Sequence, residues 1–468
     1  MALRFFNTLS KRKEEFKPLR QGEVRVYTCG PTVYDYAHIG NFRTYVFQDL
    51  LRRWLEYRGY RVYQVMNLTD VDDKTIKKSR MEGLPLRQFT QKYIDAFFED
   101  LEKLKIKKAE VYPRATEHLA DMVNLIKSLL QSGYAYMGDD RSIYFDVSKF
   151  KGYGKLSGLK VGGLKAGARV KNDLYGKGEP RDFALWKAWS EEDGDVYWET
   201  ELGKGRPGWH IECSAMSMKY LGETFDIHSG GIDLIFPHHE NEIAQSEAAT
   251  GKPLANYWLH CEHLLVDGRK MSKSLGNFYT LRDLLDKGYS PAAIRYVLLS
   301  THYRRYLNFT FQSLDAATST LERVGEFFTK LREASGGGRS REINGLLEAV
   351  ERGFCEAMDD DLDINTALAH LFKFIRRVNV LLREGTVSKG DAEKIHSLMM
   401  SLNRVLGIID GVPVAESLPE EILDMIKRRE EARRRKDWAT ADQLRSLLQG
   451  RGIILEDTPT GVKVKKKF

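Results

Sequence analysis

The chain has 468 residues, which is long for one domain, so its length predicts about two to four folded units. It contains no apolar run of about 18 residues, and its basic, aromatic start lacks a signal peptide's apolar region, so we expect neither a membrane span nor export. The four cysteines are scattered without a CxxC pair. This argues against a disulfide framework and an ordinary zinc finger, and favours a reduced, cytoplasmic compartment.

The first predicted elements are a strand, a tight turn, a helix and a second strand. Residues 23–29 alternate in polarity, which is typical of a strand, and a Gly-Pro pair follows directly. From Asn41 the apolar residues recur at spacings of three and four, which predicts a helix that ends near Gly59. A second strand is expected over residues 62–68. This order predicts an α/β fold with a parallel sheet.

Ligands of a parallel sheet lie beyond the carboxyl ends of its strands. The predicted sheet places Cys29, His38 and residues 67–70 at that edge, which makes it a candidate site. No GxGxxG follows the first strand, so a nicotinamide dehydrogenase is disfavoured.

The middle of the chain is less regular. Residues 117–205 are rich in glycine and lysine, with a Gly-Gly-Leu-Lys-Ala-Gly-Ala-Arg patch at 162–169, and we expect an inserted, partly β connective region. Mixed strands and helices are expected over 206–310. A long helical stretch follows, interrupted by a flexible Ser-Gly-Gly-Gly connection at 335–338, and apolar residues at helical spacing within 368–382 predict a bundle.

The C-terminal part concentrates the net charge of +7. Gly411-Val412-Pro413 marks a boundary, before a basic helix and a short strand at Ile453–Leu455. The lysines and arginines there fit a polyanionic partner or, as the alternative, a solvated helix face followed by a frayed tail.

Candidate metal ligands cluster in two further segments, residues 208–216 and 236–245. His238 and Glu242 are four apart, so on a helix they share one face, and His239 is expected to point elsewhere. With Cys29 and Cys213 they offer two thiolates, an imidazole and a carboxylate, a set suited to zinc. The alternative is a buried, structural cysteine with the histidines and glutamates engaged in hydrogen bonds and capping.

Two short motifs then point to a family. His38-Ile39-Gly40-Asn41 and Lys270-Met271-Ser272-Lys273-Ser274, about 230 residues apart, resemble the two signatures of class I aminoacyl-tRNA synthetases. The stretches YTCGPTVYDYAHIGN, NLTDVDDK, GWHIECSAM and HSGGIDLIFPHHENEIAQSEA, together with the C-terminal KDWATADQLRSLL and GIILEDTPTG, resemble the cysteinyl-tRNA synthetases over essentially the whole chain. One departure is Asn41, which replaces the usual histidine and can donate a hydrogen bond but carries no charge.

The resemblance implies a Rossmann-type parallel-sheet catalytic domain with a connective insertion, a helical bundle and a small C-terminal anticodon-binding domain. The implied ranges are 1–116 and 206–255 for the two catalytic halves, 117–205 for the insertion, 256–310 for the stem-contact region with the lysine motif, 311–410 for the bundle, and 411–468 for the anticodon-binding domain.

The resemblance also implies the activity and its residues. The expected reaction is ligation of L-cysteine to tRNA(Cys) through a cysteinyl-adenylate, with Mg-ATP as substrate and one zinc ion that selects the substrate thiol.

The implied catalytic and ATP-binding residues are His38, Gly40, Asn41, Lys270 and Lys273. The implied zinc ligands are Cys29, Cys213, His238 and Glu242, with His228 and His239 as residues that orient them. The implied cysteine contacts are Thr69, Trp209 and Asp233. The implied tRNA contacts are Arg433, Trp438, Asp442 and Asp457, with a core-packing role for Trp438 as the alternative.

Two other activities remain compatible with the motifs. One is a cysteine ligase that uses an amino-sugar acceptor, and the other is a non-catalytic, zinc-containing nucleic-acid-binding protein. The resemblance further implies a monomer that lacks an editing domain, in line with the short insertion.

Overall fold

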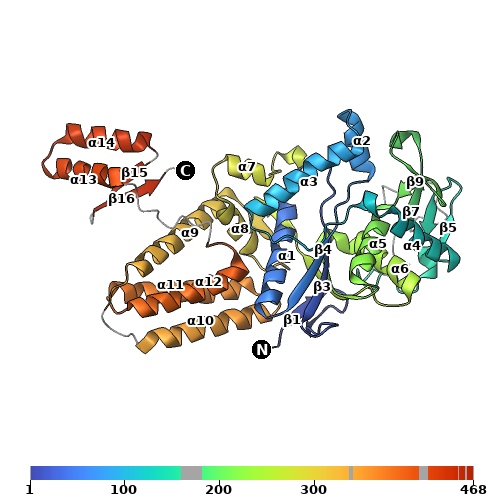
Figure 1. The fold of residues 1–468 in the computed structure, drawn as a ribbon, viewed down its shortest axis with the longest axis horizontal. Coiled ribbons are helices and arrows are strands. Elements are labelled where there is room, and N and C mark those ends of the chain that lie inside the picture. The colour runs from blue at the N-terminus through green and yellow to red at the C-terminus, as the bar shows by residue number, and fades with distance from the viewer. Residues whose placement is uncertain are drawn as a thin grey trace.

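The computed structural model describes residues 2–159, 182–336, 341–409, 420–451, 453–458 and 461–466. Its centre is a four-stranded parallel sheet in the order β11-β10-β3-β4 (Figure 1). The strands are β3 (Glu23–Thr28), β4 (Arg61–Met66), β10 (Phe225–Gly231) and β11 (Ala255–Cys261). The two strands predicted near residues 23–29 and 62–68 are therefore confirmed, as is the parallel sheet.

Helix α1 (Ile39–Tyr57) connects β3 to β4. Its apolar residues at spacings of three and four, from Val46 to Leu55, are buried in the largest core of the protein. The helix ends at Tyr57 and is capped by Arg58, and Gly59 follows with a φ of +89°, a conformation that glycine adopts without strain. The predicted helix is confirmed, and its first residues lie at the carboxyl end of β3.

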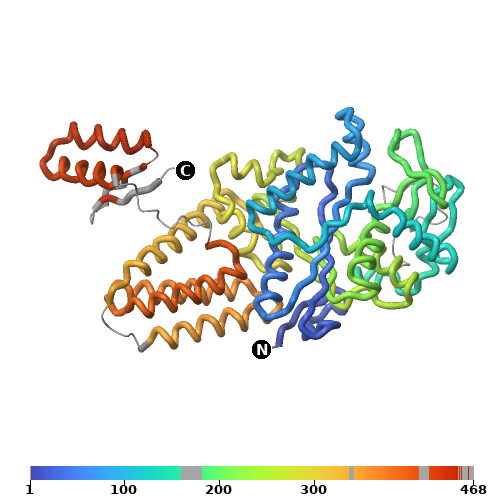
Figure 2. The backbone as a smooth tube through the Cα atoms, in the orientation of Figure 1, coloured from blue at the N-terminus to red at the C-terminus, as the bar shows by residue number. Residues whose placement is uncertain are grey.

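An antiparallel hairpin precedes the sheet and was not predicted from the sequence. Strands β1 (Arg4–Asn7) and β2 (Arg12–Glu15) pair with each other, and Thr8 N–H donates to Trp258 O of β11 at 2.8 Å. Figure 2 shows this start of the chain beside the end of α10, where Phe6 N–H donates to the Asp361 carboxylate at 2.8 Å. The hairpin thus ties the sheet to the helical part.

The insertion contains a five-stranded antiparallel sheet in the order β5-β6-β7-β9-β8. Its elements are α4 (Leu119–Gln131), β5 (Ala135–Met137), β6 (Ile143–Phe145), β7 (Phe183–Ala188), β8 (Trp198–Thr200) and β9 (Gly203–Pro207). The glycine-rich patch at 162–169 lies outside the described residues. Helix α5 (Trp209–Leu221) leads from β9 back to β10 of the parallel sheet, and α6 (Glu240–Thr250) lies between β10 and β11.

The remaining elements form a small sheet, connecting helices and a bundle. They are α2 (Asp73–Met81), α3 (Leu86–Lys103), β12 (Leu264–Val266), β13 (Arg269–Lys270), α7 (Leu281–Asp286), α8 (Pro291–Leu299), β14 (Leu307–Phe309), α9 (Phe311–Arg332), α10 (Arg341–Asp359), α11 (Ile364–Arg383) and α12 (Lys389–Leu406). Figure 1 shows the bundle α9–α12 and the insertion on opposite sides of the central sheet. Residues 368–382, whose apolar spacing predicts a bundle, lie in α11, and α11 packs within the bundle α9–α12.

One buried arginine joins the sheet unit to the bundle. Arg295 of α8 is 1% exposed; it pairs with Asp49 of α1 at 2.5 Å and donates to Leu406 O at the end of α12 at 2.8 Å. The apolar core is continuous across this junction, since residues of α1, α8 and α12 belong to one buried cluster.

The C-terminal unit has its own small core. It consists of α13 (Glu420–Arg434), α14 (Trp438–Gly450), β15 (Ile453–Thr458) and β16 (Gly461–Lys466). Its strands pair antiparallel, so the lysines of the predicted frayed tail up to Lys466 belong to a strand. The predicted boundary at 411–413 and two glycines of the 335–338 connection lie outside the described residues. Of the helices that the structure describes, none has the length and apolar character to cross a membrane.

Candidate active site

The first signature forms the start of α1. His38 caps the helix: Asn41 N–H donates to His38 Nδ1 at 3.1 Å, and His38 N–H donates to Asn41 Oδ1 at 3.1 Å. Because Nδ1 accepts a hydrogen bond, a neutral His38 carries its proton on Nε2. Burial lowers the pKa of His38 to about 4, a shift that the nearby Asp233 partly opposes. The imidazole is therefore neutral at pH 7, with one N–H group to donate.

The second signature packs directly against the first. Lys270 ends β13, Lys273 begins a 3₁₀ turn, and both side chains are exposed. Ile39 N–H donates to Tyr279 O at 2.9 Å, and the Phe278 ring meets the His38 ring edge-on at 5.2 Å.

Gly40 explains how the two signatures come so close. A Cβ atom at this position would lie 3.2 Å from Met271 Cε and 3.0 Å from the His38 ring. A side chain there would push Met271 away, so glycine permits the contact between the lysine loop and the start of α1. The two predicted signature motifs are thus brought together.

The four predicted metal ligands also meet, at the carboxyl end of the sheet. Cys29 follows β3, Cys213 lies on α5, His238 lies in the turn Ile235–His239, and Glu242 lies on α6. All four are buried, and one donor atom from each lies within 4.8 Å of the others. His238 Nε2 is 3.1 Å from Glu242 Oε1.

The pKa values of the four donors shift in different directions. Burial, together with the neighbouring Cys213, raises the pKa of Cys29 well above its ordinary value, so without a metal this thiol keeps its proton. Burial would raise the pKa of Cys213, but hydrogen bonding with Cys29 and the neighbouring His238 outweigh it and lower it to about 6. Burial would also raise the pKa of Glu242, but His228 and His238 lower it to about 2. Burial would lower the pKa of His238, but Glu242 and Cys213 raise it to about 10. A thiolate and a carboxylate side by side suit a divalent cation.

The prediction that His239 points elsewhere is wrong. Its Nε2 lies 3.2 Å from Cys29 Sγ, and Cys29, His228, His239 and Glu242 form a second group with metal-ligand geometry. The prediction assumed a continuous α-helix, whereas α6 begins only at Glu240. The preceding turn has an extended residue, Phe236, with φ −137° and ψ 129°. This irregular turn directs both neighbouring histidines into the site.

Further histidines support the ligands. His228 Nε2 lies 2.8 Å from Glu242 Oε2, His210 Nδ1 lies 2.9 Å from His238 Nδ1, and His260 Nε2 lies 2.8 Å from His239 Nδ1. Sequence reasoning missed His210 and His260. The spacing of three between His210 and Cys213 on one helix was a usable signal. His260 carried none, because it reaches the site through the pairing of β10 with β11.

The predicted cysteine contacts surround this cluster. Thr69 Oγ1 donates to Glu212 Oε2 at 3.0 Å, and the Trp209 ring lies 4.3 Å from the His238 ring while 39% of Trp209 is exposed. Asp233 is exposed in a 3₁₀ turn after β10, and its charge acts on the pKa of both His38 and Cys29. It thus stands between the first signature and the buried cluster.

The predicted tRNA contacts lie far away in the chain, in the C-terminal unit. Arg433 lies on α13, Asp457 lies on β15, and Trp438 and Asp442 lie one turn apart on α14. Trp438 is 58% exposed and is absent from the small apolar core. The alternative that Trp438 anchors this core is therefore disfavoured.

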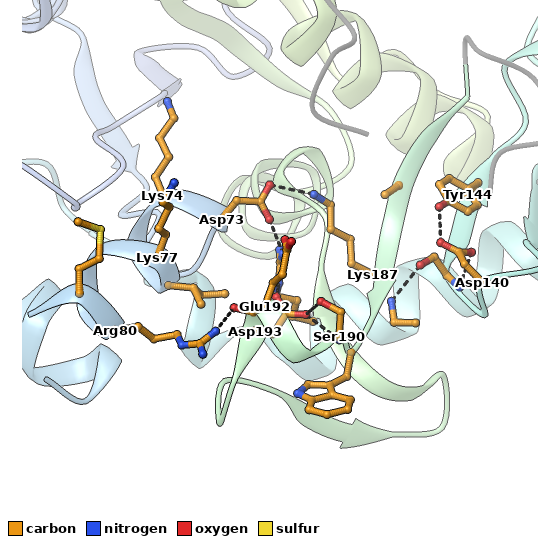
Figure 3. Close-up of a pocket in the computed structure, with 17 residues that line it drawn as sticks. Asp73, Lys74, Lys77, Arg80, Asp140, Tyr144, Lys187, Ser190, Glu192 and Asp193 are labelled. Atoms are coloured by element: carbon orange, nitrogen blue, oxygen red, sulfur yellow. Dashed lines mark hydrogen bonds and ion pairs between the residues drawn. The ribbon is translucent and has the colours of Figure 1, made fainter. Parts of the chain in front are cut away.

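A cavity of about 1010 Å³ lies outside the predicted site, between α2 and the sheet of the insertion (Figure 3). Lys74, Lys77 and Arg80 of α2 line one side, and Lys187 of β7 lines the other. Asp73 bridges the two sides by pairing with Lys187 at 3.1 Å and with Arg206. None of the predicted site residues lines this cavity.

Comparison with known proteins identifies the family. Residues 15–319 match the tRNA synthetases class I (C) catalytic domain, residues 353–410 match the DALR domain, and residues 415–464 match the cysteinyl-tRNA ligase anticodon binding domain. The chain is 49% identical over 468 residues to the cysteine–tRNA ligase of Protochlamydia amoebophila, covering 99% of this chain and 98% of that protein. The chain belongs to the cysteine–tRNA ligase family. The cysteine–tRNA ligase of Brachyspira hyodysenteriae is 50% identical over 474 residues, covering 99% of each chain.

Solved structures agree on the fold of this family member. Methionyl-tRNA synthetase of Mycobacterium tuberculosis with methionyl-adenylate has a TM-score of 0.61 at 17% identity, covering 87% of this chain and 94% of that one. Agrobacterium radiobacter LeuRS in a ternary complex with tRNA and LeuAMS has a TM-score of 0.59 at 14% identity, covering 85% of each. The predicted fold class and family are confirmed. The match at 415–464 favours a tRNA acceptor over an amino sugar.

Proposed function

We propose that this chain joins L-cysteine to tRNA(Cys), using Mg-ATP to form a cysteinyl-adenylate as the first step. One observation carries the proposal: three groups meet at one edge of the parallel sheet. They are the buried cluster around Cys29, the start of α1 at His38, and the lysine loop packed on that start. A site for an amino acid, a site for phosphates and a mobile cation are the parts that adenylate formation needs.

The start of α1 is the proposed phosphate site. A helix N-terminus attracts anions through its unpaired N–H groups, and His38 adds its Nε2–H. Lys270 and Lys273 bring positive charge to the oxygens on which charge develops during transfer. Asn41 uses Oδ1 in the helix cap, which leaves its NH₂ group to donate to a phosphate or ribose oxygen. Gly40 is the proposed point at which the nucleotide approaches the backbone, once the Met271 side chain that occupies this space has turned aside.

Thr69, Trp209 and Asp233 are the proposed contacts to the substrate cysteine. The exposed Asp233 carboxylate can accept hydrogen bonds from the substrate ammonium, and the half-exposed Trp209 ring can cover the substrate. Thr69 is buried, and its hydroxyl is fixed by the hydrogen bond to Glu212, which neighbours the ligand Cys213 on α5. Together they place the substrate carboxylate toward His38.

The donors of Cys29, Cys213, His238 and Glu242 fit one zinc ion. Their number, their softness and their mutual separation of at most 4.8 Å suit a roughly tetrahedral site. When bound, the metal supplies a Lewis acid that favours a thiolate ligand over a hydroxyl. His228 holds Glu242 in the orientation that this role needs, since histidine contacts of this kind fix a carboxylate ligand.

Such a site accounts for selection against serine. A pocket that reads shape alone separates groups of this size difference by only about 10 to 200 fold, whereas accurate translation needs about 10⁴ to 10⁵. The gap corresponds to about 3 to 5 kcal/mol. A thiol-selective ligand set closes it without an editing domain, and the insertion of residues 117–205 is accordingly short.

The proposal extends to tRNA and to the division of the chain. Residues 1–116 and 206–255 form the catalytic domain, 117–205 the insertion, 256–310 the stem-contact region, 311–410 the bundle and 411–468 the anticodon-binding domain. In the last of these, Arg433, Trp438, Asp442 and Asp457 contact the anticodon. The exposed aromatic ring and the arginine suit unstacked bases. We further propose a cytoplasmic monomer.

The test is cysteine-dependent exchange of labelled pyrophosphate into ATP, with serine in parallel and before and after removal of metal by a chelator. We expect exchange with cysteine only, loss on chelation and recovery with zinc. Serine-dependent exchange at a comparable rate would overturn the thiol selection. Failure of all exchange with zinc present would overturn the enzymatic proposal and favour a non-catalytic binding protein.

A further inference from the structure

Asp35 lies three residues before His38, in the loop between β3 and α1. Its Oδ2 accepts hydrogen bonds from Lys273 Nζ at 2.7 Å and from Lys78 Nζ of α2 at 2.8 Å. Its Oδ1 accepts from Tyr36 N–H at 2.9 Å. The carboxylate is therefore held from three sides, one of which is the lysine loop.

The two side chains of the Asp35–Lys273 pair differ in their exposure to solvent. The side chain of Lys273 is 65% exposed, whereas that of Asp35 is 24% exposed and that of Lys78 is 36% exposed. Burial alone would raise the pKa of Asp35, but hydrogen bonds from Lys273 and Lys78 outweigh it and lower the pKa below its ordinary value. Asp35 is thus the more buried, ionised partner, and Lys273 is the more exposed one.

The other contacts of the loop hold its backbone rather than this ammonium. Met271 packs against Gly40, and Asn277 bonds to the Lys270 carbonyl and the Ser272 N–H. Lys273 Nζ lies 5.0 Å from the Phe278 ring centroid, a weak cation–π contact. Within the described part of the chain, Asp35 is the carboxylate that pairs with Lys273.

We propose that Asp35 is a positioning residue that holds Lys273 beside the phosphate site before ATP binds. This inference rests on the proposed adenylation chemistry. An ammonium has three N–H donors, so Lys273 can keep Asp35 as a partner while its other hydrogens reach phosphate oxygens. Because a free lysine side chain loses rotamer entropy when it is fixed, holding it in advance makes ATP binding less costly. Lys78 donates to the same carboxylate oxygen, Oδ2, and so helps to hold Asp35 in place.

The experiment compares Asp35→Asn with Asp35→Glu and with Lys78→Met in the full chain. The first reading is trypsin cleavage after Arg269, Lys270 or Lys273 without ATP, identified by fragment mass. The second is the KM for ATP in cysteine-dependent pyrophosphate exchange, with the KM for cysteine alongside. We expect Asp35→Asn to raise the cleavage rate and the KM for ATP by about fivefold, the upper range for an exposed ion pair.

The controls separate positioning from general damage. Asp35→Glu keeps the anion and restores most of the protection. Lys78→Met removes the second ammonium but keeps the Asp35–Lys273 pair, so it raises the cleavage rate and the KM for ATP by less than Asp35→Asn does. The KM for cysteine stays unchanged in all three variants. Unaltered cleavage and unaltered KM for ATP in Asp35→Asn overturn the inference, as does an equal rise in the KM for cysteine.

If Asp35→Asn does not fold, the inference is tested on the unmodified chain by measuring how the rate of trypsin cleavage in the loop depends on salt. Salt screens exposed ion pairs, so cleavage in the loop speeds up several-fold between about 0.05 and 0.5 M NaCl if the pair holds the loop. A salt-independent rate contradicts the inference. Absence of pyrophosphate exchange in the unmodified chain refutes the proposed function instead, and the cleavage experiment still decides whether Asp35 holds the loop.

Discussion

The hydrogen bond from Asn41 and the burial of the ring determine the tautomer and the protonation state of the His38 imidazole. Asn41 N–H occupies Nδ1, and burial lowers the pKa of the ring to about 4. A protonated ring would lose the bond from Asn41, because both of its nitrogens are then donors. His38 therefore contributes one neutral N–H at physiological pH, and the positive charge at the proposed phosphate site comes from the lysine loop and the helix N-terminus.

This assignment predicts the pH dependence of His38→Gln, which keeps a neutral donor but cannot titrate. The ratio of pyrophosphate-exchange rates, unmodified chain over variant, stays constant from about pH 5.5 to 7.5, because a group with a pKa near 4 is already neutral there. A histidine acting as a cation would instead lose its advantage as pH rises through about 6.5. A ratio that falls across this range contradicts the neutral form.

Some residues of the candidate site can be predicted from the sequence, and others cannot. Cys29 and His38 follow from the position of the carboxyl end of β3, and the spacing of His238 and Glu242 predicts that they bind one metal ion together. His239 was assigned to the wrong direction because spacing assumes a regular helix. His260 could not be found at all, since strand pairing rather than sequence distance brings it to His239.

At the scale of elements, the cap of α1 serves both folding and chemistry. The mutual hydrogen bonds of His38 and Asn41 satisfy two N–H groups at the helix start, which stabilises the turn that carries the first signature. Asparagine in place of the family's usual histidine thus retains a structural role that does not need a charge.

We predict that Asn41→Ala and Asn41→Asp separate these two roles. Loss of the acceptor in Asn41→Ala lowers the free energy of unfolding by about 1 kcal/mol, measured by urea titration with circular dichroism. Asn41→Asp keeps the acceptor and adds a negative charge that suits a helix start, so its stability is maintained. The same charge repels phosphates, so its KM for ATP rises in pyrophosphate exchange. A normal KM for ATP in Asn41→Asp argues against phosphates at this position.

Periodic elements were predictable and irregular ones were not. The spacing of apolar residues gave α1, β3 and β4, because one buried face imposes its period on the sequence. The turn Ile235–His239 is set by packing between β10 and α6, and the hairpin β1–β2 by its hydrogen bonds to β11 and the bundle. Such tertiary contacts produce no periodic pattern of apolar residues in the sequence, so they cannot be predicted from it.

At the scale of the molecule, α1 is the physical link between the site and the bundle. Its first turn carries the residues that we propose to bind phosphate, and its middle is fixed through Asp49 to Arg295 and so to the end of α12. A buried, paired arginine with carbonyl partners gives a rigid junction, because neither charge can be left unpaired in the interior. The bundle therefore keeps a defined position relative to the catalytic centre.

The C-terminal unit, by contrast, has a separate core and its own surface, so its role can be altered alone. We predict that Trp438→Ala lowers kcat/KM for tRNA charging by about tenfold, since stacking of a base on an aromatic ring contributes about 1 to 3 kcal/mol. Pyrophosphate exchange stays unchanged, because adenylate formation uses none of these residues. The two activities are measured on the same preparation, with tRNA aminoacylation as the second assay.

Leu447→Ala is the matched control on the same helix. Leu447 is 51% exposed and follows Trp438 by nine residues, so at 100° per residue it lies on the opposite face of α14. The Leu447→Ala substitution also removes an exposed apolar side chain. It leaves the rate of tRNA charging unchanged if only the face of α14 that carries Trp438 contacts the anticodon. Equal losses in both variants indicate damage to the unit rather than a lost contact. An equal loss of exchange and charging in Trp438→Ala refutes the separation of the two roles.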